Sequence, residues 1–162
     1  MLSPDYYYRS VLDIDLGALA SVGIDTLLID LDNTLLPRDS DVIPDDVKAW
    51  AAGLGAAGFR ACLVSNNWHE RVVRVAEELG FELVAKAVKP LPFAFIAALR
   101  RMDSSRARAA IVGDQMFTDV LGGKLTGIPT VLVLPMSSAD LPHTLFLRRI
   151  ERVLLAGRAP LP

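Results

Sequence analysis

The sequence predicts an α/β fold: a doubly wound sheet of five parallel strands with helices on both faces. Two observations lead to this prediction. Short apolar runs alternate with amphipathic segments along the chain, and the connections between them are short. Such apolar runs are typical of strands that are covered on both faces, and regular alternation favours parallel pairing with right-handed crossovers. A chain of 162 residues is long enough for one core. We therefore expect a single domain over 1–162.

The five predicted strands are short apolar runs, each of a length usual for a buried strand. They are Thr26–Asp30, Phe59–Ser65, Phe81–Ala85, Ala109–Val112 and Pro129–Leu134. The predicted helices have apolar residues at helical spacing, and four of them are followed by a glycine that ends the helix. They are Leu16–Ala20, Pro44–Ala57, His69–Leu79, Pro90 or Pro92 to Met102, Met116–Leu125 and Thr144–Leu155. Residues 1–22, which include three consecutive tyrosines, are expected to form an irregular N-terminal arm around the first helix.

Composition limits the classes of function. The formal net charge is −2, which provides no global basic field for nucleic acid, so no nucleic-acid partner is expected. The single cysteine, Cys62, lies in an apolar run and is predicted to be an inert core residue. One cysteine cannot form an internal disulfide, and no run approaches the roughly 18 apolar residues of a membrane span. The N-terminus does not resemble a signal peptide, so we expect a cytoplasmic protein.

Unusual polar residues follow four of the predicted strands. Asp30 and Asp32 follow the first, Ser65 and Asn66 the second, Lys89 the third, and Asp114 with Asp119 the fourth. The carboxyl ends of parallel strands share one edge of an open sheet, and ligands bind at that edge. We therefore expect these side chains to gather in one site.

The chemistry of these residue types is coherent. Carboxylates such as Asp30 and Asp114 offer hard oxygen ligands to Mg²⁺. Ser65 and the helix N-terminus behind it donate hydrogen bonds to an anion, and Lys89 supplies a charge for phosphate. One carboxylate beside the metal suits a nucleophile, and a neighbouring carboxylate suits a general acid and base. Taken singly, however, Ser65, Asn66 or Asp114 could serve only as a helix cap.

In order along the chain, Asp30-Leu31-Asp32-Asn33-Thr34, Ser65, Lys89 and Gly113-Asp114 with Asp119 resemble the four motifs of the haloacid dehalogenase (HAD) superfamily. The resemblance covers nearly the whole chain and implies a Rossmann-like, three-layer α/β/α fold. It implies that Asp30 is the nucleophile, that Asp32 is the general acid and base, and that Ser65 binds a phosphate oxygen. Lys89 would neutralise the phosphate, although the nearby Lys86 is an alternative.

The same resemblance implies a phosphatase that uses Mg²⁺. The metal would be bound by Asp30, Asp114 and the backbone carbonyl of Asp32, with Asp119 behind these ligands. Thr34, Asn66 and Asn67 would contact the substrate. Further motifs resemble subfamily IIIA and its bacterial YqeG-type phosphatases, which are related to phosphatidylglycerophosphate phosphatases: Ser65-Asn66-Asn67, Lys89-Pro90 and the run from Val112 to Gly123. The substrate would then be a phosphate monoester, with a phospholipid headgroup as one candidate.

Two other classes of protein fit the motifs less well: phosphorelay receiver domains and inactive phosphate-binding modules. A phosphorelay receiver domain also carries a phosphorylated Asp on a parallel α/β fold, but its motifs come in a different order. A phosphate-binding module without activity would be expected to lack one of the acids, yet all four are present. The gaps between the motifs leave no room for a cap domain, and an open site favours a bulky substrate or a surface that excludes water. A phosphatase of small soluble or protein-bound esters is the remaining alternative.

The C-terminal segment, residues 141–162, is predicted to form an amphipathic helix and a tail. It carries four arginines, Arg148, Arg149, Arg152 and Arg158, with Glu151. Its apolar residues include Leu145, Phe146, Ile150, Val153 and Leu154. The helix either packs its apolar stripe on the sheet, with solvated arginines, or makes peripheral contact with an anionic membrane.

Overall fold

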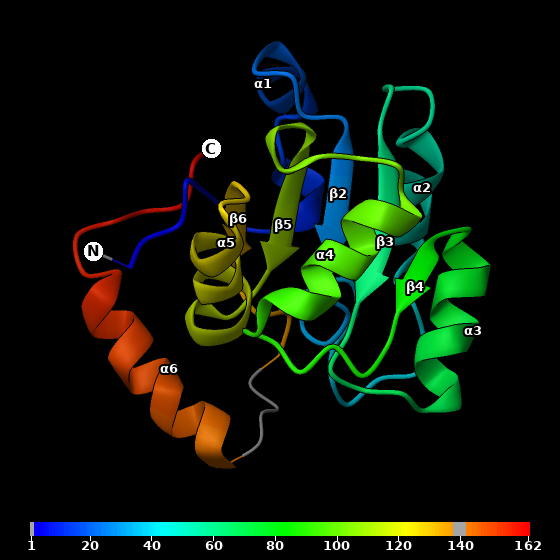
Figure 1. The fold of residues 1–162 in the computed structure, drawn as a ribbon. Coiled ribbons are helices and arrows are strands. Elements are labelled where there is room, and N and C mark those ends of the chain that lie inside the picture. The colour runs from blue at the N-terminus through cyan, green and yellow to red at the C-terminus, as the bar shows by residue number, and fades with distance from the viewer. Residues whose placement is uncertain (1, 138–141) are drawn as a thin grey trace.

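A parallel sheet of six strands forms the centre of the molecule, with helices on both of its faces (Figure 1). The computed structural model describes residues 2–137 and 142–162, without the side chains of 142–146 and 148. The strand order is β1-β6-β5-β2-β3-β4, and every neighbouring pair is parallel. The strands are β1 (Tyr6–Tyr8), β2 (Thr26–Ile29), β3 (Arg60–Val64), β4 (Glu82–Val84), β5 (Ala109–Gly113) and β6 (Thr130–Val133).

The prediction of five strands is therefore short by one, because the N-terminal arm supplies the edge strand β1. Tyr6 to Tyr8 pair in parallel with Val131 to Val133 of β6. This pairing satisfies backbone groups that an unpaired edge of β6 would leave open. Asp5 secures the arm, since its carboxylate accepts hydrogen bonds from the backbone N–H and the hydroxyl of Thr130, each at 2.8 Å. A run of three tyrosines is too short to reveal a strand by alternation.

Five of the six predicted helices are present, with shifts of up to four residues at their ends, and only the second part of the predicted helix Met116–Leu125 is an α-helix. The α-helices are α1 (Leu16–Ser21), α2 (Asp45–Gly53), α3 (Glu70–Leu79), α4 (Pro92–Arg101), α5 (Leu121–Thr126) and α6 (Pro142–Leu154). Short 3₁₀ turns occur at Val11–Asp13 and Arg106–Arg108. Throughout the described part of the chain, each helix is too short or too polar to cross a bilayer.

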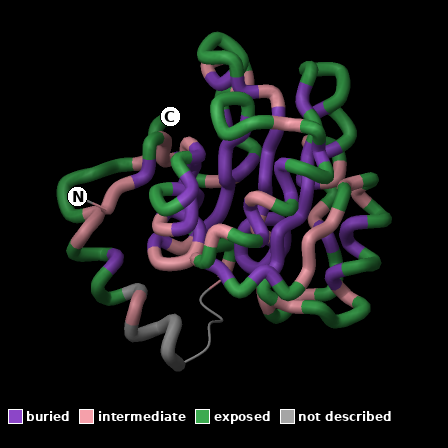
Figure 2. Tube along the Cα trace, in the orientation of Figure 1, coloured by how far each residue is buried: buried purple, intermediate pink, exposed green. Residues whose placement is uncertain are grey.

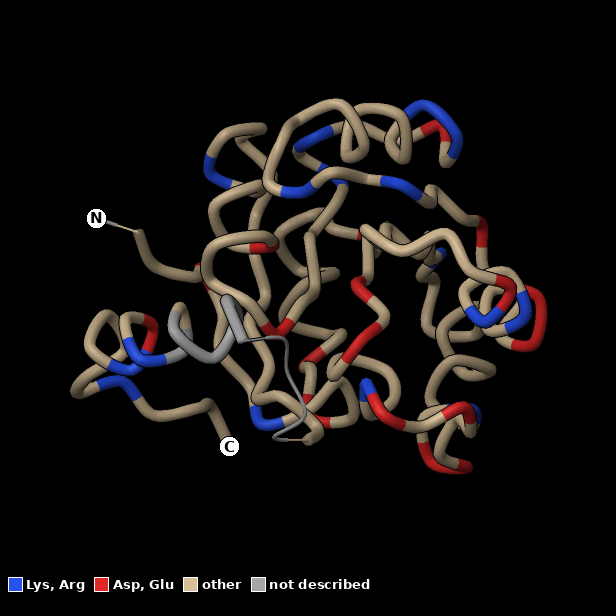
Figure 3. The backbone as a smooth tube through the Cα atoms, turned by 90° about the horizontal axis from the view of Figure 1, so that it is seen from below, with Lys and Arg blue, Asp and Glu red and all other residues tan. Residues whose placement is uncertain are grey.

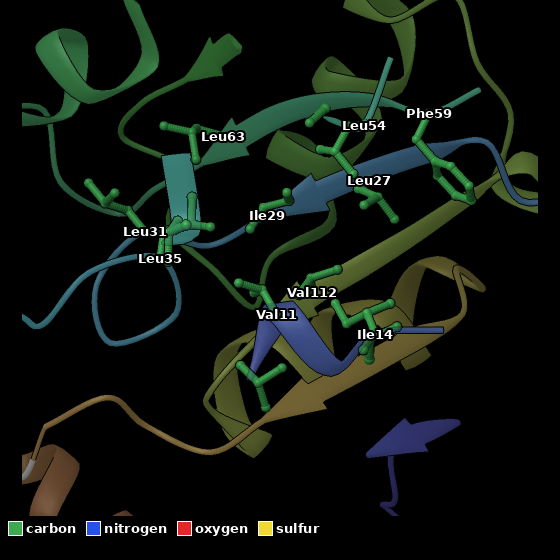
Figure 4. Close-up of a cluster of buried hydrophobic side chains, with 14 of the residues drawn as sticks. Val11, Ile14, Leu27, Ile29, Leu31, Leu35, Leu54, Phe59, Leu63 and Val112 are labelled. Atoms are coloured by element: carbon green, nitrogen blue, oxygen red, sulfur yellow. The ribbon is translucent and has the colours of Figure 1, made fainter. Parts of the chain in front are cut away.

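The core lies on the two faces of the sheet and reflects the alternation of side chains along each strand. One face packs Leu27 and Ile29 of β2 with residues of α1, α2 and α3 (Figure 4). The opposite face packs Leu28 of β2 against α4. The central strands β2 and β5 are buried throughout, and most exposed residues lie in the outer helices and the loops (Figure 2).

Cys62 belongs to the α4 face, where it is fully buried in β3. Burial raises the pKa of its thiol to about 12, which keeps it protonated. The prediction of an inert core cysteine is confirmed.

Helix α6 is anchored to the body by a buried carboxylate as well as by apolar packing. Glu151 Oε1 accepts a hydrogen bond of 2.8 Å from the backbone N–H of Met116. Leu154 packs against the apolar cluster around Met116, whereas Val153 is 74% exposed. The predicted apolar stripe is thus split between the body and solvent, and the side chains of Leu145, Phe146 and Arg148 lie outside the described residues.

A candidate active site at the carboxyl edge of the sheet

The carboxyl ends of β2, β3 and β5 meet at one edge because these strands are adjacent and in register. Ile29 of β2 is paired with Leu63 of β3 on one side and with Val112 of β5 on the other. The residues that follow these three positions therefore emerge side by side. Figure 3 views the molecule from this edge, and acidic positions lie near its centre.

Three carboxylates gather at this edge. Asp30, Asp114 and Asp119 each offer an oxygen within 4.8 Å of the other two. Asp114 and Asp119 are buried, and the Asp30 side chain is 11% exposed. Buried charges of one sign require a compensating charge, and Lys89 supplies one. Its Nζ lies 2.6 Å from Asp30 Oδ1 and 2.7 Å from Asp119 Oδ1.

The electrostatics of this cluster favour an additional cation. Three carboxylates lie within one small volume, and Lys89 contacts two of them, Asp30 and Asp119, so the repulsion among the carboxylates favours a further positive charge nearby. Burial raises the pKa of Asp30 to about 6, more than the nearby Lys89 lowers it, and Asp119 adds to the increase. The two carboxylates in turn raise the pKa of Lys89 despite its burial, so the lysine stays charged.

The donor set fits a hard divalent cation such as Mg²⁺. All three groups are oxygen donors, and the described residues offer no other cluster of three His, Cys, Asp or Glu ligands. A dication would reduce the repulsion among these carboxylates. The carboxylates of Asp30 and Asp114 lie where the sequence predicted metal ligands. An oxygen of Asp119, which the motifs place behind these ligands, also lies within 4.8 Å of those of the other two carboxylates.

Asp119 reaches the cluster through a local change in the backbone. The sequence predicted a continuous helix from Met116 to Leu125, but the structure has a π-helical turn, η3 (Met116–Val120), before α5 begins. Such turns are rare and occur often at functional sites. Gly113 makes room for the carboxylate, because a Cβ on this glycine would lie 2.2 Å from Asp119 Cγ. Periodicity did not reveal this turn, because η3 and α5 together show the same apolar spacing as one helix.

Asp32 lies next to Asp30 in the motif, but its carboxylate has separate partners. Asn67 Nδ2 donates a hydrogen bond of 2.6 Å to Asp32 Oδ2. Arg71 Nη1 lies 2.5 Å from Asp32 Oδ1. The carboxylate is 8% exposed and is held between the loop after β3 and the first turn of α3.

Arg71 is a site residue that the sequence reasoning missed. Besides Asp32, its guanidinium donates to the backbone carbonyls of Pro37 and Ser40, at 3.1 and 2.8 Å from Nη2. It therefore connects α3, the proposed general acid and the loop that follows β2. An arginine near the start of an amphipathic helix is usual, and its partner lies 39 positions away, so no local signal marked it.

The remaining predicted residues line the same edge. Thr34 Oγ1 lies 3.4 Å from Asp30 Oδ2, and Asn66 Oδ1 accepts a hydrogen bond of 2.7 Å from the backbone N–H of Lys89. Ser65 is buried, and its hydroxyl accepts a hydrogen bond of 3.1 Å from the backbone N–H of Asn67.

The choice between the two lysines is resolved by their positions. Lys86 is exposed, and its Nζ lies 5.4 Å from the centroid of the Trp68 ring. Lys89 is buried between two carboxylates of the cluster, as described above. Lys89 is therefore the lysine at the site.

Comparisons of the sequence with known proteins agree with the motifs. A family model described as HAD-hydrolase-like matches residues 86–139. The protein named "Probable phosphatase YqeG" from Bacillus subtilis (strain 168) is 35% identical over 154 residues, which cover 95% of this chain and 90% of that protein. The chloroplastic phosphatidylglycerophosphate phosphatase 1 of Chlamydomonas reinhardtii is 32% identical over 88% of this chain, which spans 57% of the algal protein.

Solved structures support the fold. An HAD-like family hydrolase from Porphyromonas gingivalis superposes with a TM-score of 0.58 at 12% identity, covering 82% of this chain and 98% of that one. The cobalt-bound deoxy-D-mannose-octulosonate 8-phosphate phosphatase of Haemophilus influenzae gives 0.55 at 12% identity, covering 83% and 88%. From the motifs, the carboxylate cluster and the extent of the match to YqeG, we conclude that the chain belongs to the YqeG-type phosphatases of the HAD superfamily.

Proposed function

We propose that the protein is a Mg²⁺-dependent phosphatase that hydrolyses a phosphate monoester through an aspartyl-phosphate on Asp30. The observation that carries this proposal is the convergence of Asp30, Asp114 and Asp119, with the ammonium group of Lys89 in contact with Asp30 and Asp119. This arrangement provides an oxygen nucleophile, a place for a divalent cation and a fixed positive charge for phosphate within one small volume.

The first chemical step is proposed at Asp30. Its carboxylate attacks phosphorus, the bond between phosphorus and the ester oxygen breaks, and the departing oxygen takes a proton from Asp32. Ionisation of Asp30 is required, and the pKa of about 6 in the metal-free protein leaves it largely ionised at neutral pH. Lys89 lies 2.6 Å from the nucleophile, where its charge can offset the charge of the phosphoryl group.

The second step returns the enzyme to its starting state. Asp32, now ionised, removes a proton from water, the water oxygen attacks phosphorus, and the acyl-phosphate bond breaks to regenerate Asp30 and release phosphate. The contacts of Asp32 with Asn67 and Arg71 support this role, because they orient a carboxylate that must both give and take a proton.

Mg²⁺ is proposed to be held by Asp30 and Asp114, with the backbone carbonyl of Asp32 as a further ligand. When bound, such an ion neutralises charge on the phosphoryl oxygens and helps to orient them. The position of the Asp119 carboxylate in the same cluster supports a role for this residue in setting the charge of the site.

For the substrate, we propose phosphatidylglycerophosphate or a closely related phospholipid monoester. The support is the 32% identity to the algal phosphatidylglycerophosphate phosphatase and the short connections between the motifs, which leave no room for a cap domain. An uncapped site can reach a headgroup at a surface, so we also propose a cytoplasmic protein that contacts the inner face of the membrane peripherally.

The test of the chemistry combines two variants with metal removal. Asp30→Asn is expected to lower kcat by several orders of magnitude while far-UV circular dichroism stays unchanged. Asp46→Asn, at an exposed acidic position in the first turn of α2 and outside the carboxylate cluster, serves as the matched control with wild-type activity. Activity should vanish in EDTA and return with Mg²⁺. An Asp30→Asn enzyme within tenfold of the wild type would refute the nucleophile assignment, and full activity in EDTA would refute the metal.

The test of the substrate is a direct comparison of kcat/KM. Phosphatidylglycerophosphate in mixed micelles should be preferred over sugar phosphates, nucleotides and phosphopeptides. Preference for a small soluble ester would assign the enzyme to that substrate class instead, while leaving the chemistry of Asp30 intact.

A further inference from the structure

We infer that the groove between β6 and α6 binds the part of the substrate that lies beyond the phosphate: an apolar chain together with a second anionic group. This inference rests on the proposed function and adds a binding site for the substrate's leaving group. The groove has a volume of about 260 Å³.

The groove is continuous with the catalytic edge. Asp114, one of the three clustered carboxylates, forms part of its wall. The opposite wall is α6, which runs beside the sheet at its β1 and β6 side (Figure 1). Because Asp114 belongs to both, a substrate whose phosphate lies at the carboxylates has the groove directly beside it.

Among the described residues, the lining is mostly apolar and carries one cation, Arg152, and two carboxylates, Asp114 and Glu151, of which Glu151 accepts the hydrogen bond from Met116. Tyr7, Leu132, Pro135 and Leu155 provide apolar surface, and Arg152 lies at the same groove. An apolar wall beside an exposed guanidinium matches a ligand that combines an acyl chain with an anion, and a phospholipid phosphodiester is such a ligand. Sites for whole drug-sized ligands usually measure about 300–1,000 Å³, so this groove suits one segment of a lipid rather than the whole molecule.

The wall formed by α6 is fixed in position by Glu151. The hydrogen bond from Met116 to Glu151 joins α6 to η3, the turn that carries Asp119 into the carboxylate cluster. Leu154 and Leu155 also pack against the apolar cluster around Met116. The turn η3 therefore fixes α6, a wall of the groove, relative to the catalytic carboxylates. A ligand that contacts both would meet two surfaces that are held in place relative to each other.

The experiment compares two substrates: phosphatidylglycerophosphate with short acyl chains, and the same compound without its acyl chains, which keeps both the phosphodiester and the terminal phosphate. For the wild type, KM for the acylated substrate is expected to be lower. Leu155→Asp places a charge in the apolar wall and should raise the ratio of the acylated to the deacylated KM by about tenfold or more. Leu134→Asp, at a half-exposed position of the same groove, is the second variant in case Leu155→Asp folds poorly.

Two matched controls lie on α6 outside the groove. Val153→Asp introduces the same charge at a residue that is 74% exposed and should leave the ratio unchanged. For the cation of the groove, the test variant is Arg152→Ala, which should raise KM for both substrates because both contain the phosphodiester. Its control is Arg149→Ala, which should leave both KM values unchanged. Melting temperatures establish that each variant is folded.

The possible outcomes distinguish failure of the groove inference from failure of the proposed function. If the wild type hydrolyses the lipid but folded groove variants leave the KM ratio unchanged, the groove inference is wrong and the phosphatase proposal stands. If the wild type hydrolyses small esters but not the lipid, the lipid substrate and the groove both fail. If Leu155→Asp changes only the oligomeric state in size-exclusion chromatography, a second copy of the chain covers the groove and the inference is overturned.

Discussion

Gly113→Ala tests whether Asp119 belongs to the metal site, because the missing side chain of this glycine leaves room for the carboxylate. A Cβ at position 113 would lie 2.2 Å from both Cγ and Oδ2 of Asp119. Nonbonded carbon atoms pack at about 3.5–4.0 Å, so the carboxylate would have to move by roughly 1 Å or more. Such a shift breaks the 2.7 Å contact with Lys89 Nζ and removes an oxygen from the cluster of three.

The expected decreases in Mg²⁺ affinity and in stability follow from the displacement of the Asp119 carboxylate. Loss of a partner that orients a metal site typically costs about 10–100-fold in metal affinity or activity. Overpacking adds about 1–3 kcal/mol of destabilisation, and each kcal/mol lowers the melting temperature by about 2–4 °C for a chain of this size. We therefore expect weaker Mg²⁺ binding by isothermal titration calorimetry, a smaller rise in melting temperature on adding Mg²⁺, and lower activity.

Gly53→Ala is the matched control, since no atom lies within 4 Å of its added Cβ and the position ends α2. It should keep wild-type Mg²⁺ affinity and change stability by about 1 kcal/mol at most. Wild-type Mg²⁺ affinity and activity in Gly113→Ala would refute the close approach of Asp119 to Gly113. A lower melting temperature with unchanged Mg²⁺ affinity would show that Asp119 lies in the core but outside the metal site.

Three further predictions concern the same edge of the sheet. In the metal-free protein, folded Asp30 holds its proton more tightly than the unfolded chain does, with a pKa of about 6 against 3.8, so this residue lowers stability as pH rises from about 4 to above 6. Asp30→Asn should gain up to roughly 3 kcal/mol relative to the wild type between those pH values in urea titrations, and a pH-independent difference would contradict the assignment. Arg71→Ala should lower kcat about tenfold more for an alkyl phosphate than for p-nitrophenyl phosphate, whose leaving group needs no proton; equal losses would indicate a purely structural role. Asp114→Asn should abolish the rise in melting temperature that Mg²⁺ produces, and an undiminished rise would remove Asp114 from the ligands.

The sequence by itself determined the parallel sheet and the edge at which the site lies. Apolar runs such as Thr26–Ile29 and Ala109–Gly113 are predicted as buried strands because they are short, apolar and alternate along the chain with helical patterns. Chain order then places Asp30 and Asp114 at the carboxyl ends of adjacent strands. Their proximity follows from parallel pairing, which the alternation of strands and helices already implied.

Only the tertiary structure decided which side chains pair across that edge and which segments complete the sheet. Tyr6–Tyr8 becomes a strand because β6 offers an open edge, and three residues contain no periodicity to show it. Arg71 is paired with Asp32, and Glu151 with Met116, across more than thirty positions of the chain. Such pairings depend on how α3 and α6 pack against the sheet, and this packing arises from long-range contacts that no local pattern encodes.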